Sequence, residues 1–324
     1  MAQTFTLPEP ITNQAAAVLK KKKGEYIYTF YGLDSTKQSQ GVHRKVFRLD
    51  LQAGRSKLIG QVPDSLGRLA SSASVIRNKA YIVGGYGVYR NGKEISSKQV
   101  FIFDPGKESF SKGADLPVAI DDQIQAVWRD SLLYVISGWN DSVNVHTVQV
   151  FNPANNQWKL GTPLPNEITA AVFGGCGAIK GDTIYMLGGA TFAKFYPPSR
   201  QFYKGIIDRN DPPSIKWINA GEFPGEFRDR SIAFEKEGKI YFWGGSNETY
   251  NYNGISYSNK QPVEPNRTVL IYEISTGLFT TKPVKNPVMD LRNLVNTSAN
   301  KTYVAGGMGH GQKLEKAISE IIID

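Results

Sequence analysis

The sequence has 324 residues, of which 40% are hydrophobic and 11% aromatic, and its 32 glycines and 17 prolines are spread along the chain. This composition favours an all-β domain, and no run approaches the ~20 apolar residues that a membrane-spanning helix needs. The formal charge of +9 suits an anionic partner, but no basic stretch is interleaved with stacking aromatics, so nucleic-acid binding is not expected. Cys176 is the only cysteine, which excludes an internal disulfide.

One short pattern recurs six times along the chain: an apolar strand that begins with Tyr and ends in glycine. The final glycines of successive copies are separated by 53, 53, 51, 56 and 62 residues. Six copies at a period of ~50 residues predict the six blades of a β-propeller. The copies are Tyr28–Gly32, Tyr81–Gly85, Tyr134–Gly138, Tyr185–Gly189, Tyr241–Gly245 and Tyr303–Gly307.

Each copy sits in the same frame of predicted strands. An apolar strand and a tight turn come before it, and a loop, a third strand, a turn and a fourth strand come after it. This order predicts a four-stranded antiparallel meander in every repeat, within one domain over residues 1–324. The expected blades span about 11–63, 64–117, 118–165, 166–225, 226–286, and 287–324 together with 4–10.

The two ends of the chain predict how the ring closes. The last repeat stops at residues 319–324, a third strand with no fourth strand after it, while residues 4–10 look like a fourth strand without a repeat. The N-terminal strand is therefore expected to complete the sixth blade, which would protect the strand edges of the ring.

The glycine pair, the third strand after it and a Trp in the fourth strand, at Trp158 and Trp217, are features by which the chain resembles the kelch-repeat family. The resemblance covers essentially the whole length, although Tyr31 and Ser137 replace the first glycine in blades one and three. It implies a six-bladed kelch propeller with a buried Trp in the fourth strand.

In such a meander, the loops that enter strand one and the loops that follow the glycines converge on one face, which is the default site. Arg68, Arg228 and Arg292 enter strand one in three blades, and Asp121 and Asp122 do so in blade three. Arginines suit an acidic, hydroxyl-bearing ligand, since a guanidinium binds a carboxylate in a bidentate fork. The alternative is that these arginines make structural pairs between blades. Further candidate ligand-binding residues follow the glycines: Tyr86, Trp139, Phe192, Tyr250 and His310.

Two long aromatic loops follow the glycines of blades four and five, and the second runs from Ser246 to about Arg267. Loops of this length without their own secondary structure are usually functional or disordered, and the aromatic content argues against disorder.

Residues 173–192 of blade four resemble the corresponding blade of the bacterial N-acetylneuraminate epimerases, which are sialic acid mutarotases. That family is thought to use an acidic residue just after a blade glycine and an Arg that opens the next strand. By blade order these positions fall near Trp139 and His146. The alternative is that blade five carries the pair, with Glu248 or Glu264 beside Arg267. The candidate catalytic residues are therefore Glu248, His146 and Arg267.

These observations leave two functions open. The first is a carbohydrate-directed propeller that binds a small acidic sugar in the central funnel and exchanges its anomers. The second is a non-enzymatic recognition module that grips a protein or glycan partner with its long loops. We expect no cofactor and no metal, because the three histidines lie in different blades. We also expect a soluble protein without membrane insertion, periplasmic or exported if a signal peptide has been removed.

Overall fold

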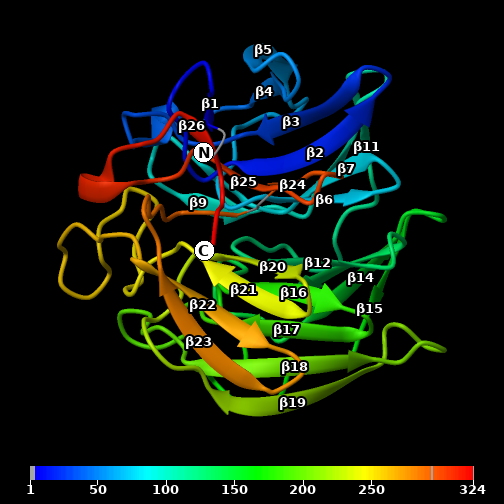
Figure 1. Cartoon of the computed structure of the whole chain (residues 1–324), viewed down its shortest axis with the longest axis vertical. Helices are drawn as coiled ribbons and strands as arrows, with labels where there is room; N and C mark the ends of the chain where they lie inside the picture. Colours follow the sequence, from blue (N-terminus) through cyan, green and yellow to red (C-terminus); the bar gives the residue numbers. More distant parts are fainter. Residues whose placement is uncertain (1–3, 293–294, 324) are drawn as a thin grey trace.

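The computed structural model describes residues 4–292 and 295–323, which form six four-stranded antiparallel sheets (Figure 1). The strands of blade one are β2 (Ala15–Lys21), β3 (Gly24–Phe30), β4 (Lys45–Asp50) and β5 (Arg55–Gln61). Those of blade two are β6 (Ser72–Ile76), β7 (Lys79–Val83), β10 (Val100–Asp104) and β11 (Ser109–Lys112). Those of blade three are β12 (Ile124–Trp128), β13 (Leu132–Ile136), β14 (Val148–Asn152) and β15 (Gln157–Leu160).

The remaining blades repeat this order. Blade four holds β16 (Cys176–Lys180), β17 (Thr183–Leu187), β18 (Gln201–Ile207) and β19 (Ile215–Glu222). Blade five holds β20 (Ile232–Lys236), β21 (Lys239–Trp243), β22 (Thr268–Glu273) and β23 (Leu278–Pro283). Blade six holds β24 (Val295–Asn296), β25 (Thr302–Ala305), β26 (Ala317–Glu320) and β1 (Thr4–Thr6). A hairpin of β8 (Tyr86–Val88) and β9 (Glu94–Ser96) and two 3-10 turns, η1 (Ser39–Gly41) and η2 (His310–Gln312), lie between blade strands.

The N-terminal strand closes the ring as predicted. β1 pairs antiparallel with β26, with Thr4 opposite Ser319 and Thr6 opposite Ala317. The strand is shorter than the predicted 4–10 because the prolines at 8 and 10 lack the N–H that a ladder needs. Asp324, the last residue of the predicted closing segment, lies outside the described residues.

The second strand of each blade ends in a left-handed residue, which explains the repeated glycines. Gly245 has a φ of 73°, and a Cβ there would lie 2.4 Å from the carbonyl oxygen of Asp229. The position before it is also left-handed, and Tyr31 and Ser137 adopt it with φ values of 60° and 52°. Ser137 holds this conformation through its hydroxyl, which donates to the carbonyl of Val172 at 2.8 Å. These two substitutions therefore preserve the backbone of the repeat.

Trp158 and Trp217 lie in the fourth strands β15 and β19, as predicted, but they are half-buried rather than fully buried. Their indole N–H groups join neighbouring blades: Trp158 donates to the carbonyl of Ala114 at 2.8 Å, and Trp217 to that of Thr162 at 3.1 Å. Each Trp thus stabilises a blade contact by a hydrogen bond as well as by packing.

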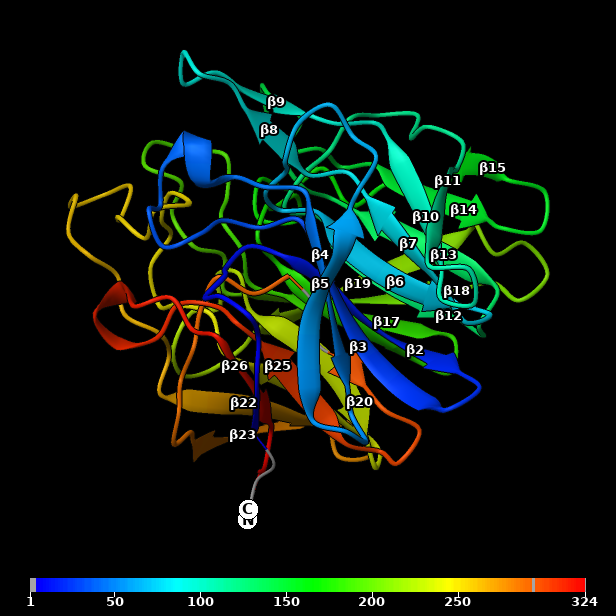
Figure 2. The ribbon, with the colours of Figure 1, turned by 90° about the horizontal axis from the view of Figure 1, so that it is seen from above.

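The long connections and the tight turns lie on opposite faces of the ring. In Figure 1 the loop of blade five (yellow to orange) and η2 (red) project at the left, and the turns between first and second strands lie at the right. Figure 2 shows the β8 and β9 hairpin projecting on the same side as these loops. We call the first side the loop face and the second the turn face.

Candidate functional site

Six residues form a ring around the axis on the loop face, one just before the first strand of each blade. All have a positive φ, between 48° at Asp122 and 69° at Gly174. Backbone hydrogen bonds join successive members: Gly174 donates to Asp122 at 2.8 Å, and Arg230 donates to Gly174 at 2.7 Å. The ring therefore ties each blade to the next. Its members are Asn13, Ala70, Asp122, Gly174, Arg230 and Asp290.

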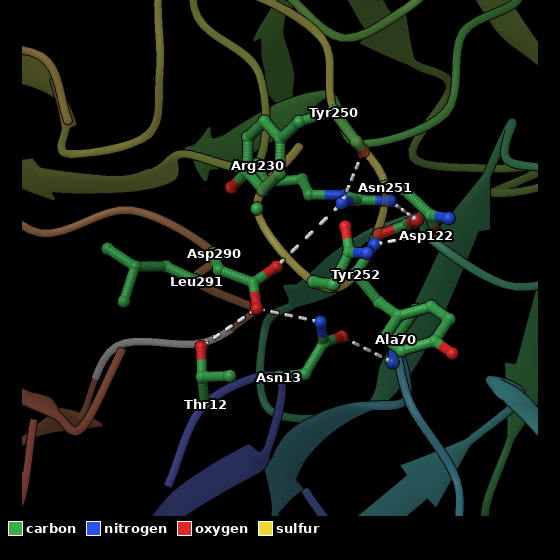
Figure 3. A network of polar contacts seen from close by, with 12 residues as sticks. Thr12, Asn13, Ala70, Asp122, Arg230, Tyr250, Asn251, Tyr252, Asp290 and Leu291 are labelled. Atoms are coloured by element: carbon green, nitrogen blue, oxygen red, sulfur yellow. Dashed lines mark hydrogen bonds and ion pairs between the residues drawn. The ribbon is translucent and has the colours of Figure 1, made fainter. Parts of the chain in front are cut away.

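Charged side chains of this ring meet near the axis (Figure 3). Nη2 of Arg230 lies 3.1 Å from Oδ2 of Asp122, and Nε of Arg292 lies 3.0 Å from Oδ1 of the same carboxylate. Arg292 also lies 3.2 Å from Asp290, to which the amide of Asn13 donates at 2.7 Å. No charged side chain in this network is more than 4% exposed. The charges of the arginines and aspartates neutralise one another. Because these side chains are buried against one another, they close this end of the axis.

The blade-five loop, residues 246–267, covers this network. The guanidinium of Arg230 donates to the carbonyl of Tyr250 at 2.7 Å and lies 4.8 Å from the centre of its ring. Tyr250 is fully buried, and Tyr252 packs against a hydrophobic cluster of blades one and two that includes Leu33 and Leu69, across the axis from blade five. Figure 3 shows residues 250–252 beside Asp122 and Ala70. The loop thus fills the centre of the face where an open funnel was expected.

Two buried carboxyl groups, each next in the chain to a charged member of the ring, have a strongly raised pKa. The pKa of Asp229 is raised to about 8, chiefly by burial; the charges of Asp122 and Asp290 act in the same direction, while Arg230 and Arg292 oppose the shift. Both carboxyl oxygens of Asp229 lack a hydrogen-bond partner among the described residues. Burial also raises the pKa of the second group, Asp121, which accepts a hydrogen bond from the hydroxyl of Ser96 at 2.5 Å.

The three predicted arginines are all engaged in internal contacts. Arg68 pairs with Asp64 at 2.6 Å and donates to a backbone carbonyl of its own blade at 2.9 Å. Arg228 donates to the carbonyl and hydroxyl of Thr268 at 2.8 and 3.0 Å, and burial lowers its pKa to about 10. Only Arg292 reaches the axial network. The structural alternative considered for these side chains therefore describes their contacts.

An aromatic surface lies beside the covered centre, formed by blades three, four and five. The rings of Trp139 and Phe192 are 5.7 Å apart, those of Trp139 and Tyr196 5.8 Å, and those of Tyr196 and Tyr257 5.0 Å. Phe192 is 45% exposed and Phe195 49% exposed. The aromatic surface is defined as these four rings, Trp139, Phe192, Tyr196 and Tyr257, together with Phe195, which precedes Tyr196 in the chain.

The blade-four loop presents these rings at a conformational cost. Phe195 and Tyr196 are consecutive and both left-handed, with φ values of 66° and 51°. Such residues cost of order 1–3 kcal/mol each and concentrate at ligand-binding sites. The strain is held in place by contacts that include a hydrogen bond from the hydroxyl of Thr249 to the carbonyl of Tyr196, at 2.6 Å.

A cavity of about 200 Å³ lies at the base of the blade-five loop and brings together residues from both of its ends. Glu248, Glu264 and Arg267 line it, with Asn247 and Asn266 among its polar neighbours. Arg267 is exposed and makes no ion pair within the described residues. The cavity therefore combines acid–base groups with a free guanidinium, and we call it the blade-five cavity.

The carboxylates of this cavity are already oriented. Glu264 lies 2.7 Å from Nδ1 of His310 and accepts the backbone N–H of Gly311 at 3.0 Å. Glu248 accepts a hydrogen bond from the side chain of Asn259 at 3.2 Å. Thr249, next to Glu248, makes the hydrogen bond to the blade-four loop, so the blade-five cavity adjoins the aromatic surface.

The structure brings only some of the predicted site residues together. Glu248 and Arg267 share the blade-five cavity, whereas His146 precedes β14 in blade three and does not line it. Tyr86 is buried near the axis, like Tyr250. Of the predicted aromatic residues, Trp139 and Phe192 have rings in contact on the loop face.

Sequence reasoning missed Arg230, which is central to the axial network. The spacing from the second glycine of the repeat could have identified it. In blades two, four and five the ring residue lies 15 residues before that glycine, at Ala70, Gly174 and Arg230. We instead chose the position 17 residues before this glycine, which is occupied by Arg68 and Arg228. The side chains of these two arginines turn into their own blades.

Two models of the kelch motif match residues 129–165 and 67–117. With six blades of four antiparallel strands, the chain is a six-bladed β-propeller that contains kelch motifs. Its central channel and loop face follow from that class.

Comparison with individual proteins adds two groups of relatives. The chain is 28% identical over 145 residues to N-acetylneuraminate epimerase of Haemophilus influenzae (strain PittEE), covering 44% of this chain and 32% of that protein. It is 27% identical over 185 residues to Kelch-like protein 35 of Mus musculus, covering 56% and 28%. The chain thus spans about a third of the length of these curated relatives. The solved structure titled "Structure of YjhT" superposes with a TM-score of 0.76 at 15% identity, over 98% of this chain and 97% of that one, which shows the shared fold.

No helix within residues 4–292 and 295–323 is long and apolar enough to cross a membrane.

Proposed function

We propose that this protein is a carbohydrate-directed propeller that binds an acidic sugar on its loop face and exchanges the anomers of that sugar. The observation that carries the proposal is the blade-five cavity, where Arg267 lies beside Glu248 and Glu264 and has no ion-pair partner in the part of the chain that the structure describes. The relationship to proteins named N-acetylneuraminate epimerase supports an acidic sugar as the ligand class.

The blade-five cavity and the aromatic surface each bind a different part of the sugar. Arg267 is suited to a sugar carboxylate, because a guanidinium offers two parallel N–H donors to both oxygens. The aromatic surface next to it offers Phe192 and Tyr196 to the apolar face of a sugar ring. A cavity of about 200 Å³ holds part of a monosaccharide and leaves the rest against these rings.

Anomer exchange needs a base and an acid and no cofactor. One carboxylate takes the proton of the anomeric hydroxyl while the bond between the anomeric carbon and the ring oxygen breaks, and an acid protonates the ring oxygen. In the open form the carbonyl group turns about the bond between the former anomeric carbon and the next carbon of the chain, and the reverse proton transfers then close the ring on the other face. Glu248 and Glu264 are the candidates for these two roles, with His310 as a neighbouring proton carrier.

Saturation-transfer NMR with N-acetylneuraminate tests the binding part of the proposal. Wild-type protein is expected to transfer saturation to the sugar, and Arg267→Met is expected to weaken binding by about tenfold or more, since an interaction of a charged group with a carboxylate is lost. Arg55→Met is the matched control, because Arg55 is exposed on β5 in blade one. Absence of transfer, or equal binding by Arg267→Met and wild type, would refute the proposed site.

The exposed aromatic rings favour a second candidate, a recognition module without catalysis. Phe192 and Phe195 are each nearly half exposed on a strained loop, and some relatives are named Kelch-like proteins. In that case Phe192→Ala and Phe195→Ala abolish capture of a glycan or protein partner, while Glu248→Gln leaves it unchanged. A glycan array measured with these three variants tests glycan capture, and the rate of anomer exchange separates the two candidates, because a recognition module leaves that rate equal to the rate of the sugar alone.

A further inference from the structure

The turn face carries a second feature, a channel along the axis with a cavity of about 740 Å³. It is lined by the first strands of all six blades, and many of the lining residues are small, such as Ala17, Ala73 and Ala126. Arg292, a member of the axial network, also lines this cavity, so the network closes its loop-face end. The channel is therefore a socket that is open toward the turn face and blind at the other end.

The wall of this socket is made of unpaired strand edges. β2, β6, β12, β16, β20 and β24 are each the terminal strand of their sheet. Half of the backbone N–H and C=O groups of an edge strand have no ladder partner. Near the closed end, Oε1 of Gln123 is buried and accepts no hydrogen bond within the described residues. These groups match the donors and acceptors of an extended peptide.

The mouth of the socket is surrounded by basic turns. The six turns between first and second strands cover residues 20–25, 76–79, 128–132, 180–183, 235–239 and 297–301, and they hold eleven Lys and Arg against five Asp and Glu. Every one of them contains at least one basic residue. Lys20 lines the cavity together with Glu25 and Glu235, and Glu235 pairs with Lys180 at 2.9 Å. Lys20, Lys22, Lys23 and Arg77 are exposed and make no ion pair within the described residues. A surplus of positive charge at a concave site attracts and holds anions.

We propose that the turn face binds an extended acidic peptide, whose tip enters the axial socket while its carboxylates lie over the basic turns. A nucleic acid fits less well, because a duplex is too wide to enter a cavity of this volume and the bases of a single strand need an aromatic platform, whereas the one Trp of these turns, Trp128, is buried. The volume lies within the ~300–1,000 Å³ of small-ligand sites, so it holds a few residues and not a folded domain. This site is on the face opposite to the blade-five cavity and is independent of the sugar proposal.

Fluorescence anisotropy with a labelled peptide of alternating Glu and Ala tests this proposal at low and at high salt. We expect binding that weakens with salt, that is absent for the matching Lys and Ala peptide, and that falls by about tenfold in the double variant Lys22→Glu, Lys23→Glu. The charge-matched control is Lys57→Glu, Lys216→Glu, whose lysines are exposed on the outer strands β5 and β19. This control is expected to bind like wild type.

Insertion of the peptide tip into the socket is tested separately, by substitutions that place larger side chains in the cavity. Val18 and Val127 line the cavity and are only partly buried, so Val18→Phe and Val127→Phe each narrow the channel from a different blade. Each variant is expected to bind the peptide with an affinity about tenfold lower than wild type, while the melting temperature of the protein stays unchanged. Two variants ensure that a folding defect in one leaves the test intact. Failure of wild type to bind, full binding by both filled variants, or tighter binding of duplex DNA than of the peptide would overturn the proposal.

Discussion

Replacing Asp229 by Asn should change how the stability of the propeller depends on pH. The carboxyl group of Asp229 has no exposed surface, and burial raises its pKa from 3.8 to about 8. Between these values the folded protein keeps a proton that the unfolded chain releases, so rising pH favours the unfolded state. The stability that this group contributes is complete below about pH 4 and is lost progressively up to about pH 8.

The size of the effect follows from the same values. One pH unit in this window is worth up to about 1.4 kcal/mol for one proton. The unfolding free energy of Asp229→Asn should therefore rise, relative to wild type, by roughly 2–3 kcal/mol between about pH 5 and pH 7. Urea unfolding followed by circular dichroism at these two values measures it, with Asp115→Asn, an exposed aspartate, as control. An equal pH dependence for Asp229→Asn and wild type would refute the inference that this carboxyl group is protonated in the fold.

Three further substitutions test the architecture by thermal or urea unfolding. Arg230→Met leaves the carboxylate of Asp122 without one of its buried partners and should cost about 3–5 kcal/mol, whereas a loss below about 1 kcal/mol would mean that the axial network is not a structural closure. Trp158→Phe removes the indole hydrogen bond to the preceding blade and should cost about 1 kcal/mol, while unchanged stability would show that packing alone joins these blades. Gly245→Ala forces a Cβ into a left-handed position against a backbone carbonyl and should cost more than about 1 kcal/mol; a stable variant would contradict the close approach described for this glycine.

The fold was predictable from sequence because a propeller repeats one local pattern. The glycines at the end of each second strand mark a backbone conformation that side chains rarely adopt, so their spacing counted the blades directly. The unpaired strands at the two ends then predicted the pairing of β1 with β26. Even the departures at Tyr31 and Ser137 left the pattern readable.

The site was less predictable for two physical reasons. A shift of two residues decides whether a side chain before strand one reaches the axis, as Arg230 does, or turns into its own blade, as Arg228 does. The direction of a long loop is set by tertiary contacts, here the packing of Tyr252 against blades one and two, and no local pattern encodes it. Spacing around the glycines could place Glu248 and Arg267 at the two ends of one loop but not predict the cavity between them.

The rate of anomer exchange of N-acetylneuraminate, followed by NMR in the presence of catalytic amounts of protein, tests the proposed function most directly. We expect the wild-type protein and Arg55→Met to accelerate exchange, Glu248→Gln or Glu264→Gln to lower the rate by about 10²-fold, and Arg267→Met to weaken substrate binding. An exchange rate equal to that of the sugar alone, or an acceleration that both Gln variants retain in full, would contradict the assignment of the blade-five cavity as a catalytic site.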